Sequence, residues 1–171
     1  MTAVTKADVK LKMNIEILKL TPEFTEDFGY VIYTAWGEAY KGLMPDSVLE
    51  GRSSERWTQR AKENPENKYI AFADGKAVGV IGFLPQARDF VTNRESGEIV
   101  ALYVLKEYQK NGIGKALLNE ALNDIGEKNV TLFMLKGNDN AASFYRKMGF
   151  CFTGKELSDN GLIELEMILK R

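Results

Sequence analysis

The sequence predicts a single domain of the α/β or α+β class, built on one mixed sheet. Its 171 residues suit one domain, and their composition (44% hydrophobic, 27% charged) is that of an ordinary globular protein. Along the chain the hydrophobic pattern switches repeatedly between the period of a strand and the period of a helix. Asp74-Gly75 and Asn160-Gly161 each separate two apolar runs, which is typical of tight β-hairpins. We therefore expect both helical and hairpin connections.

The chain begins with a stretch that carries no folding signal. Residues 1–13 lack the apolar core of a signal peptide, and we expect a flexible leader there, followed by one domain at residues 14–171. No apolar run approaches the ~18–20 residues that a membrane-spanning helix requires.

Residues 14–20 alternate between apolar and polar side chains, which predicts the first strand.

Helices are expected next. Thr21 is an N-cap residue type and Pro22 suits the first helical position, so a helix should begin there and run towards Tyr40. Gly42 and Pro45 should end it. Two further helical segments are expected, a short turn at 46–49 and a helix between Ser54 and Asn64.

The centre of the chain predicts most of the sheet. Residues 99–105 form an unbroken apolar run, which predicts a strand buried on both faces. From Ile113 to about Lys128 the apolar positions have helical spacing. The other expected elements are strands at 68–73 and 76–84, a polar connection at 86–97, a strand at 130–135, a helix at 141–148, and closing strands at 150–156 and 162–169.

The segment between the central strand and its helix has the composition of an anion-binding turn. It reads Gln109-Lys110-Asn111-Gly112-Ile113-Gly114-Lys115. A helix start offers unpaired backbone N–H groups and a partial positive charge, and the two glycines leave room for a pyrophosphate. It is not a nucleotide P-loop, because Gln109 replaces the first glycine and Ala116 the hydroxyl residue. It is not a dinucleotide fingerprint, because Leu117 replaces the third glycine.

Two motifs together resemble one known family. Gln-x-x-Gly-x-Gly at 109–114 is similar to the coenzyme A pyrophosphate loop of the GNAT superfamily of N-acetyltransferases. Residues 138–150, Asn-Asp-Asn-Ala-Ala-Ser-Phe-Tyr-Arg-Lys-Met-Gly-Phe, resemble the other hallmark of that family, in the expected order and separation. The resemblance extends over residues 69–150. It implies a mixed, mostly antiparallel central sheet flanked by helices, with two splayed parallel strands at the coenzyme A site.

The resemblance also implies a reaction and a set of site residues. The reaction is direct transfer of an acetyl group from acetyl-CoA, as cosubstrate, to a primary amine of a small molecule or peptide. Tyr145 would act as general acid, and Glu98 as general base, directly or through water. The implied cofactor-binding residues are Leu102, Val104, Gln109, Asn111, Gly112, Ile113, Gly114, Lys115 and Asn138. The implied acceptor-binding residues are Trp36, Tyr40 and Met44.

Each role has a simpler structural alternative. The glycines could form only a tight turn, and Gln109 could only cap the loop. Tyr145, Trp36 and Tyr40 could be packing aromatics, and Asn138 a turn or cap residue. Glu98 could be a solvated residue at a strand edge. The whole chain could also be a non-catalytic module that senses acyl-CoA or binds a partner on the same fold.

Composition narrows the chemistry further. The chain has no histidine, which removes the commonest general base and Ser-His or Cys-His nucleophile pairs, and we expect no metal site. A net charge of −1 argues against nucleic acid as the main partner. Cys151, the single cysteine, is expected to be a small buried apolar residue, and a cytoplasmic location without membrane association follows as the default. A homodimer is possible by resemblance; the acceptor and the acyl-chain length stay open.

Overall fold

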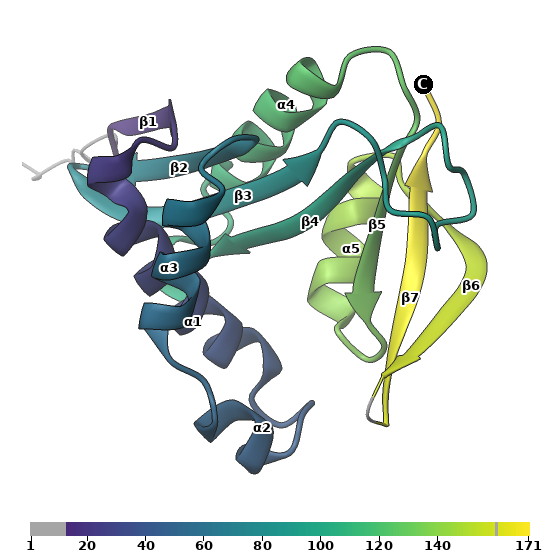
Figure 1. Ribbon diagram of the computed structural model, residues 1–171, viewed down its shortest axis with the longest axis horizontal. Helices are drawn as coiled ribbons and strands as arrows, with labels where there is room; N and C mark the ends of the chain where they lie inside the picture. Colours follow the sequence, from purple (N-terminus) through teal and green to yellow (C-terminus); the bar gives the residue numbers. More distant parts are fainter. Residues whose placement is uncertain (1–12, 160) are drawn as a thin grey trace, which may run out of the picture.

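The computed structural model describes residues 13–159 and 161–171 and contains a mixed sheet with helices on both faces (Figure 1). Within these residues the strand order is β1-β2-β3-β4-β5-β7-β6, and only the β4–β5 pair is parallel. The elements in chain order are β1 (Ile15–Lys19), the 3-10 turn η1 (Pro22–Phe24), α1 (Thr25–Tyr40), α2 (Asp46–Glu50), α3 (Ser54–Glu63), β2 (Lys68–Ala73), β3 (Lys76–Leu84), β4 (Gly97–Val104), the 3-10 turn η2 (Lys106–Tyr108), α4 (Ile113–Ile125), β5 (Val130–Leu135), α5 (Asp139–Lys147), β6 (Cys151–Asp159) and β7 (Leu162–Leu169).

The predicted fold class is confirmed, and four strands have the predicted bounds: β2, β3, β5 and β7. The ends of helices differ more. The first helix starts as a 3-10 turn, and the Thr21 side chain makes no cap hydrogen bond to it. Helix α4 ends at Ile125 because Gly126 adopts a left-handed φ of 79°. Strand β6 continues to Asp159, into the turn predicted at residues 158–161.

The predicted leader falls mostly on residues 1–12, which lie outside the described residues. Its last residue, Met13, is half-buried and packs against the hydrophobic core. Asn14 is fastened to the β2–β3 hairpin, since its N–H donates to Asp74 Oδ1 at 3.0 Å and its carbonyl accepts from the Asp74 N–H at 2.9 Å. The folded part of the chain therefore begins at Met13 at the latest.

Helices α1 and α3 cover one face of the sheet, and α4 and α5 lie behind the other (Figure 1). The amphipathic α4 buries Ile113, Leu117, Leu118, Ala121 and Ile125. Gly79 of β3 permits this close packing, because a Cβ there would lie 3.0 Å from both Ile113 and Leu117 side chains. The start of α4 is thus fixed against the middle of the sheet.

The parallel strands β4 and β5 separate partway along their length. They pair at only three positions, from Gly97↔Val130 to Ile99↔Leu132. Beyond Ile99, β4 continues along β3 and β5 continues along β7, so the two strands diverge (Figure 1). A bulge lies at the same point, because Gly82 and Phe83 of β3 face Ala101 and Ile99, which leaves Val100 unpaired. The splay implied by the family resemblance is confirmed.

This divergence corrects the prediction that the central strand is buried on both faces. Gly97, Glu98 and Ile99 are buried, but Val100 is 45% exposed and residues 101–104 are only half-buried. The apolar run predicted burial on both faces. The second half of β4 instead lines a gap that β5 has left. A ligand could bind along such an apolar strand and cover its open edge.

Two buried carboxylates fasten the connection between β3 and β4. Glu98 is fully buried and accepts hydrogen bonds from Arg88, at 3.1 Å from its N–H and 3.0 Å from Nε. Glu166 of β7 is also fully buried and accepts from the Thr92 N–H at 2.7 Å and from Thr153 Oγ1 at 2.6 Å. The alternative that Glu98 is a solvated residue is therefore wrong, and the segment predicted as a polar connection is anchored at two points.

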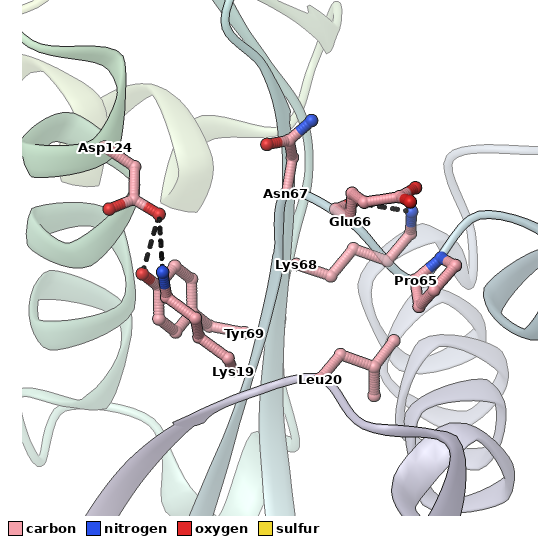
Figure 2. A pocket seen from close by; sticks show the side chains of 8 residues that line it. All are labelled: Lys19, Leu20, Pro65, Glu66, Asn67, Lys68, Tyr69 and Asp124. Atoms are coloured by element: carbon pink, nitrogen blue, oxygen red, sulfur yellow. Dashed lines mark hydrogen bonds and ion pairs between the residues drawn. The ribbon is translucent and has the colours of Figure 1, made fainter.

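Near its C-terminus, α4 is joined to β2 by a hydrogen bond and to β1 by an ion pair. The Tyr69 hydroxyl donates to Asp124 Oδ2 at 2.7 Å, and Lys19 Nζ lies 3.7 Å from the same oxygen. These residues line one side of a cavity of about 320 Å³, with Lys68 and Glu66 on the other (Figure 2). Burial and the bond to Asp124 raise the pKa of Tyr69. The hydroxyl therefore stays protonated and remains a donor at neutral pH.

We expect Tyr69→Phe to destabilise the fold by about 1.5 kcal/mol, the lower end for a hydrogen bond to a charged group. The ring keeps its stacking on Phe83, so the loss isolates the hydroxyl. The raised pKa makes this stabilisation complete below pH ~10 and progressively lost above it, because the unfolded tyrosine ionises there first. Denaturant unfolding at pH 7 and pH 11 measures both effects. The exposed Tyr30→Phe is the control, and an equal loss in both variants would contradict the assignment.

Candidate active site

The predicted pyrophosphate loop lies at the start of α4, beside the gap between β4 and β5. Gly112 precedes the helix with φ 82° and ψ −2°, a left-handed conformation that favours glycine. The first backbone bond of the helix runs from the Ala116 N–H to the Gly112 carbonyl at 2.9 Å. The N–H groups of Ile113, Gly114 and Lys115 thus precede any intrahelical acceptor. A Cβ on Gly112 would meet no atom within 4 Å, so the backbone here faces open space.

The loop is held from within by two amide side chains. Gln109 Nε2 donates to the Val104 carbonyl at 3.0 Å, which closes the loop onto the end of β4. Asn111 Nδ2 donates to the carbonyls of Tyr108 and Gln109, at 3.1 Å each. Both side chains therefore bind the loop backbone, and the groups left for an anion are the backbone N–H groups and the exposed Lys115.

The open edge of β4 carries the backbone groups of Leu102 and Val104. The Leu105 N–H donates to Val78 of β3 at 2.9 Å. Because the backbone groups of successive residues alternate between the two edges of a strand, those of Leu102 and Val104 point away from β3. That edge faces the gap where β5 has diverged. The Val104 carbonyl already accepts from Gln109, and the remaining groups of this edge, the Val104 N–H and those of Leu102, could pair with an extended ligand arm.

Tyr145 lies on α5, and Asn138 is the residue that precedes this helix. Tyr145 is 9% exposed, and its ring packs edge-on against Phe144 and Phe150. Burial, with a smaller contribution from Tyr40, raises the pKa of Tyr145. Asn138 caps the helix, since its Oδ1 accepts from the Ala141 N–H at 3.1 Å. The capping alternative for Asn138 is thus observed, and its amide Nδ2 is the group left for a ligand.

The predicted acceptor residues come together on the other face of the sheet. The rings of Trp36 and Tyr40 pack edge-on at 4.6 Å, and the Tyr40 hydroxyl lies 3.5 Å from the Tyr103 hydroxyl. Met44 is half-buried in the following loop. The same loop reaches the β5–α5 turn, because a Cβ on Gly137 would lie 3.7 Å from Leu43. The α1–α2 region thus borders the gap.

Glu98 lies at the far end of β4 from this group. It pairs with Thr131 in the part of β4 that β5 still accompanies, whereas Tyr103 and Val104 belong to the diverged part. Its carboxylate is bonded to Arg88. The structure therefore does not bring Glu98 together with Tyr145 and Tyr40, and its role as a base stays a prediction.

Sequence reasoning missed two residues at the site. Tyr103 could have been found, because strand alternation directs the Tyr103 side chain to the face opposite Leu102 and Val104. Arg52 carries no such signal. It lies between α2 and α3, and the chain brings it to 3.1 Å from the centre of the Trp36 ring only through helix packing.

Three other predictions concern Cys151, metal binding and membrane-spanning helices. Cys151 is exposed, so the prediction that it is buried is wrong; it stands at the start of β6, near the edge of the sheet. Within residues 13–159 and 161–171, no three His, Cys, Asp or Glu side chains are placed to hold a metal ion. No helix in the described part of the chain has the length and apolar character needed to cross a bilayer.

Comparisons with known proteins agree with this geometry. A family model described as an acetyltransferase (GNAT) domain matches residues 40–171. A spermidine N(1)-acetyltransferase of Thermoplasma acidophilum is 29% identical over 159 residues, which is 86% of this chain and 94% of the relative. "Probable N-acetyltransferase Rv2775" of Mycobacterium tuberculosis is 27% identical over 148 residues, 83% of each chain.

A solved structure supports the same conclusion. The PaiA N-acetyltransferase of Thermoplasma acidophilum, crystallised in complex with coenzyme A, superposes with a TM-score of 0.75 at 26% identity. The superposition includes 93% of this chain and 100% of that one. With the splayed strands, the glycine loop at the start of α4 and the matched domain, the chain belongs to the GNAT family of acetyl-CoA-dependent N-acetyltransferases.

Proposed function

We propose that this protein moves the acetyl group of acetyl-CoA directly to a primary amine of a small molecule or peptide. The observation that carries the proposal is the gap between β4 and β5. At one end of the gap lies a helix start with free N–H groups, and beside the gap lie the tyrosines Tyr40 and Tyr103. When bound, the coenzyme would supply the activated acetyl thioester. No covalent intermediate with the enzyme is needed.

Binding of the coenzyme is assigned to the loop and the open strand edge. The N–H groups from Asn111 to Lys115 would hold the pyrophosphate, with the dipole of α4 and the Lys115 cation favouring its charge. Leu102 and Val104 would pair with the pantetheine arm as an added strand, and the Val104 N–H would polarise the thioester carbonyl. Gln109 would keep the loop closed, and Asn138 would bind the arm through its amide.

We assign to Tyr145 the role of general acid, which donates a proton to the leaving thiolate. As the amine nitrogen bonds to the acetyl carbon and the carbon–sulfur bond breaks, the sulfur gains a proton and the amine loses one. Burial keeps the Tyr145 hydroxyl protonated well above neutral pH, so it can act as the donor. The amine gives its proton to the base, and a proton from solvent or from that base then restores the Tyr145 hydroxyl.

Glu98 is the proposed base, directly or through water, and this role has its own test. Since its carboxylate is bonded to Arg88, either the ion pair opens or water relays the proton. Glu98→Gln should lower kcat roughly 10²-fold and remove the acidic limb of the pH–rate profile. Arg88→Gln breaks the same ion pair but should keep that limb. An unchanged acidic limb in Glu98→Gln would show that the base lies elsewhere and that the ion pair is structural.

The experiment that tests the proposal as a whole is release of free coenzyme A thiol from acetyl-CoA across a panel of primary amines. Mass spectrometry should then find each product 42 Da heavier, the mass of an added acetyl group in place of hydrogen. The panel includes spermidine, because a relative that is 29% identical bears the name of a spermidine acetyltransferase. Binding of acetyl-CoA without transfer to any amine would favour the alternative, a non-catalytic acyl-CoA sensor.

We further propose a cytoplasmic location, and the family resemblance makes a homodimer the oligomeric state to test. A chain whose single cysteine cannot form an internal disulfide fits a reducing compartment. Light scattering in solution measures the oligomeric state, and a mass near 19.2 kDa would contradict the dimer.

A further inference from the structure

Arg52 occupies an unusual position beside the proposed acceptor site. Its guanidinium stacks 3.1 Å from the centre of the Trp36 ring and lies 5.7 Å from that of Trp57. Stacking on an aromatic face fixes the plane of the guanidinium and leaves its N–H edges free to bind a planar group.

Arg52 has no carboxylate in direct contact among the residues that the structure describes, since none forms an ion pair with it within 4.0 Å. Its Nη2 atom is buried and has no hydrogen-bond partner in the same part of the chain. A buried N–H of a cation that lacks an acceptor is costly, so such groups usually bind something.

The guanidinium also reaches the acceptor side of the gap. Burial raises the pKa of Tyr40 and of Tyr103, and in both cases the nearby charge of Arg52 opposes the rise. At Tyr40 the Glu164 carboxylate adds to the rise in pKa. These two hydroxyls lie 3.5 Å apart, with Tyr103 on the diverged part of β4. A group bound by Arg52 would therefore lie close to the tyrosines that border the reacting amine.

The cavity beside Arg52 has an excess of positive charge. It has a volume of about 330 Å³ and is lined by Arg52, Lys41, Glu38 and Tyr33 among others. Glu38, its acidic lining residue, accepts from the backbone N–H of Lys106 at 2.9 Å. The cavity thus has two cations and one carboxylate that already binds the backbone, and its size suits a small molecule.

We propose that the acceptor is a small amine that also carries a carboxylate, and that Arg52 binds this carboxylate. The inference rests on the proposed acetyl transfer and adds the class of acceptor. The rigid fork of the guanidinium fits a carboxylate with two parallel hydrogen bonds, and the Trp36 ring holds it in that orientation. A polyamine would instead bring further positive charge to Arg52 and Lys41. The preferred acceptor thus differs in charge from spermidine.

The test compares acceptors that differ only by the carboxylate: lysine with cadaverine, ornithine with putrescine, and phenylalanine with phenethylamine. The wild-type protein should have a kcat/KM roughly tenfold to a hundredfold higher for the carboxylate member of its best pair, as one hydrogen-bonded charge pair provides. Arg52→Gln should bring this ratio close to one. Because both members are measured on one enzyme sample, partial unfolding of the variant does not change the ratio.

Arg56→Gln is the matched control, since it removes an exposed arginine a few residues away and should keep the wild-type ratio. The inference would be overturned if the wild type used the decarboxylated members equally well or better. It would also be overturned if Arg52→Gln kept the wild-type ratio of kcat/KM within each pair. If no amine at all is acetylated, the proposed function fails instead. Calorimetry of the same pairs on the coenzyme A complex then decides the inference, and equal affinities within each pair would reject it.

Discussion

Gly114→Val should abolish measurable coenzyme A binding while the protein still folds. Gly114 is the second residue of α4, and its N–H belongs to the unpaired groups at the helix start. A Cβ there would lie 3.5 Å from the Phe144 ring, an ordinary contact, but the two further methyl groups of valine would reach into the space above the loop. Loss of two hydrogen bonds to a charged phosphate corresponds to roughly a 10²–10⁴-fold loss of affinity. Isothermal titration calorimetry with coenzyme A measures it.

Gly114→Ala is the matched variant, because its single methyl group fits beside Phe144 and should leave affinity within a few fold of the wild type. Gly126→Ala adds a second control at the other end of α4. It introduces a side chain at a φ of 79°, so it strains the helix terminus without approaching the loop. Unchanged affinity in Gly114→Val, or an equal loss in Gly126→Ala, would remove the loop from the proposed coenzyme site.

The parts of the site that the sequence predicted are those encoded by neighbouring residues. Gly112 and Gly114 precede a helical pattern, and a helix start has the same free N–H groups in every fold. Hairpin signals such as Asp74-Gly75 act within four residues, and β2 and β3 consequently have the predicted bounds. Such local signals were sufficient for the fold class and for the position of the loop.

The parts that the sequence did not predict depend on contacts between distant segments. The apolar run of β4 indicated full burial, but the strand separates from β5 after Ile99. Only the family resemblance implied this splay, because a single strand contains no record of where its neighbour departs. The ion pair of Glu98 with Arg88 joins residues across a connection that looked merely polar. Arg52 reaches Trp36 only once α1 and α3 have packed together. These three features are tertiary, and two of them, the divergence of β4 from β5 and the position of Arg52, concern the gap or its surroundings.

The pKa values of the tyrosines at the site also depend on contacts between distant segments, which the sequence does not reveal. Tyr40, Tyr103 and Tyr145 are ordinary aromatic residues in the sequence, yet burial raises the pKa of each hydroxyl. The shift arises because the surrounding protein excludes water, which disfavours the charged phenolate. A cluster of protonated hydroxyls beside the gap can donate hydrogen bonds throughout the neutral range.

Tyr145→Phe should lower kcat roughly 10²-fold and leave the affinity for acetyl-CoA unchanged within a few fold. The phenylalanine ring keeps the edge-on contacts with Phe144 and Phe150, so the core of α5 is preserved and only the hydroxyl is lost. In the wild type the raised pKa keeps this proton in place below pH ~10, so loss of activity from its ionisation is expected only above that value. Steady-state kinetics between pH 6 and 10 separate the effect on kcat from that on KM.

Tyr108→Phe is the control, because it removes a tyrosine hydroxyl from η2, outside the group that surrounds the gap. It should turn over at the wild-type rate. Since the proposed acid acts only as the carbon–sulfur bond breaks, its loss must appear in kcat and not in coenzyme binding. A Tyr145→Phe variant with wild-type kcat would make the residue a packing aromatic, and the thiolate would then leave without a proton from the protein. A variant that loses acetyl-CoA affinity instead would assign Tyr145 to binding, which the buried position of its ring beside Phe150 does not favour.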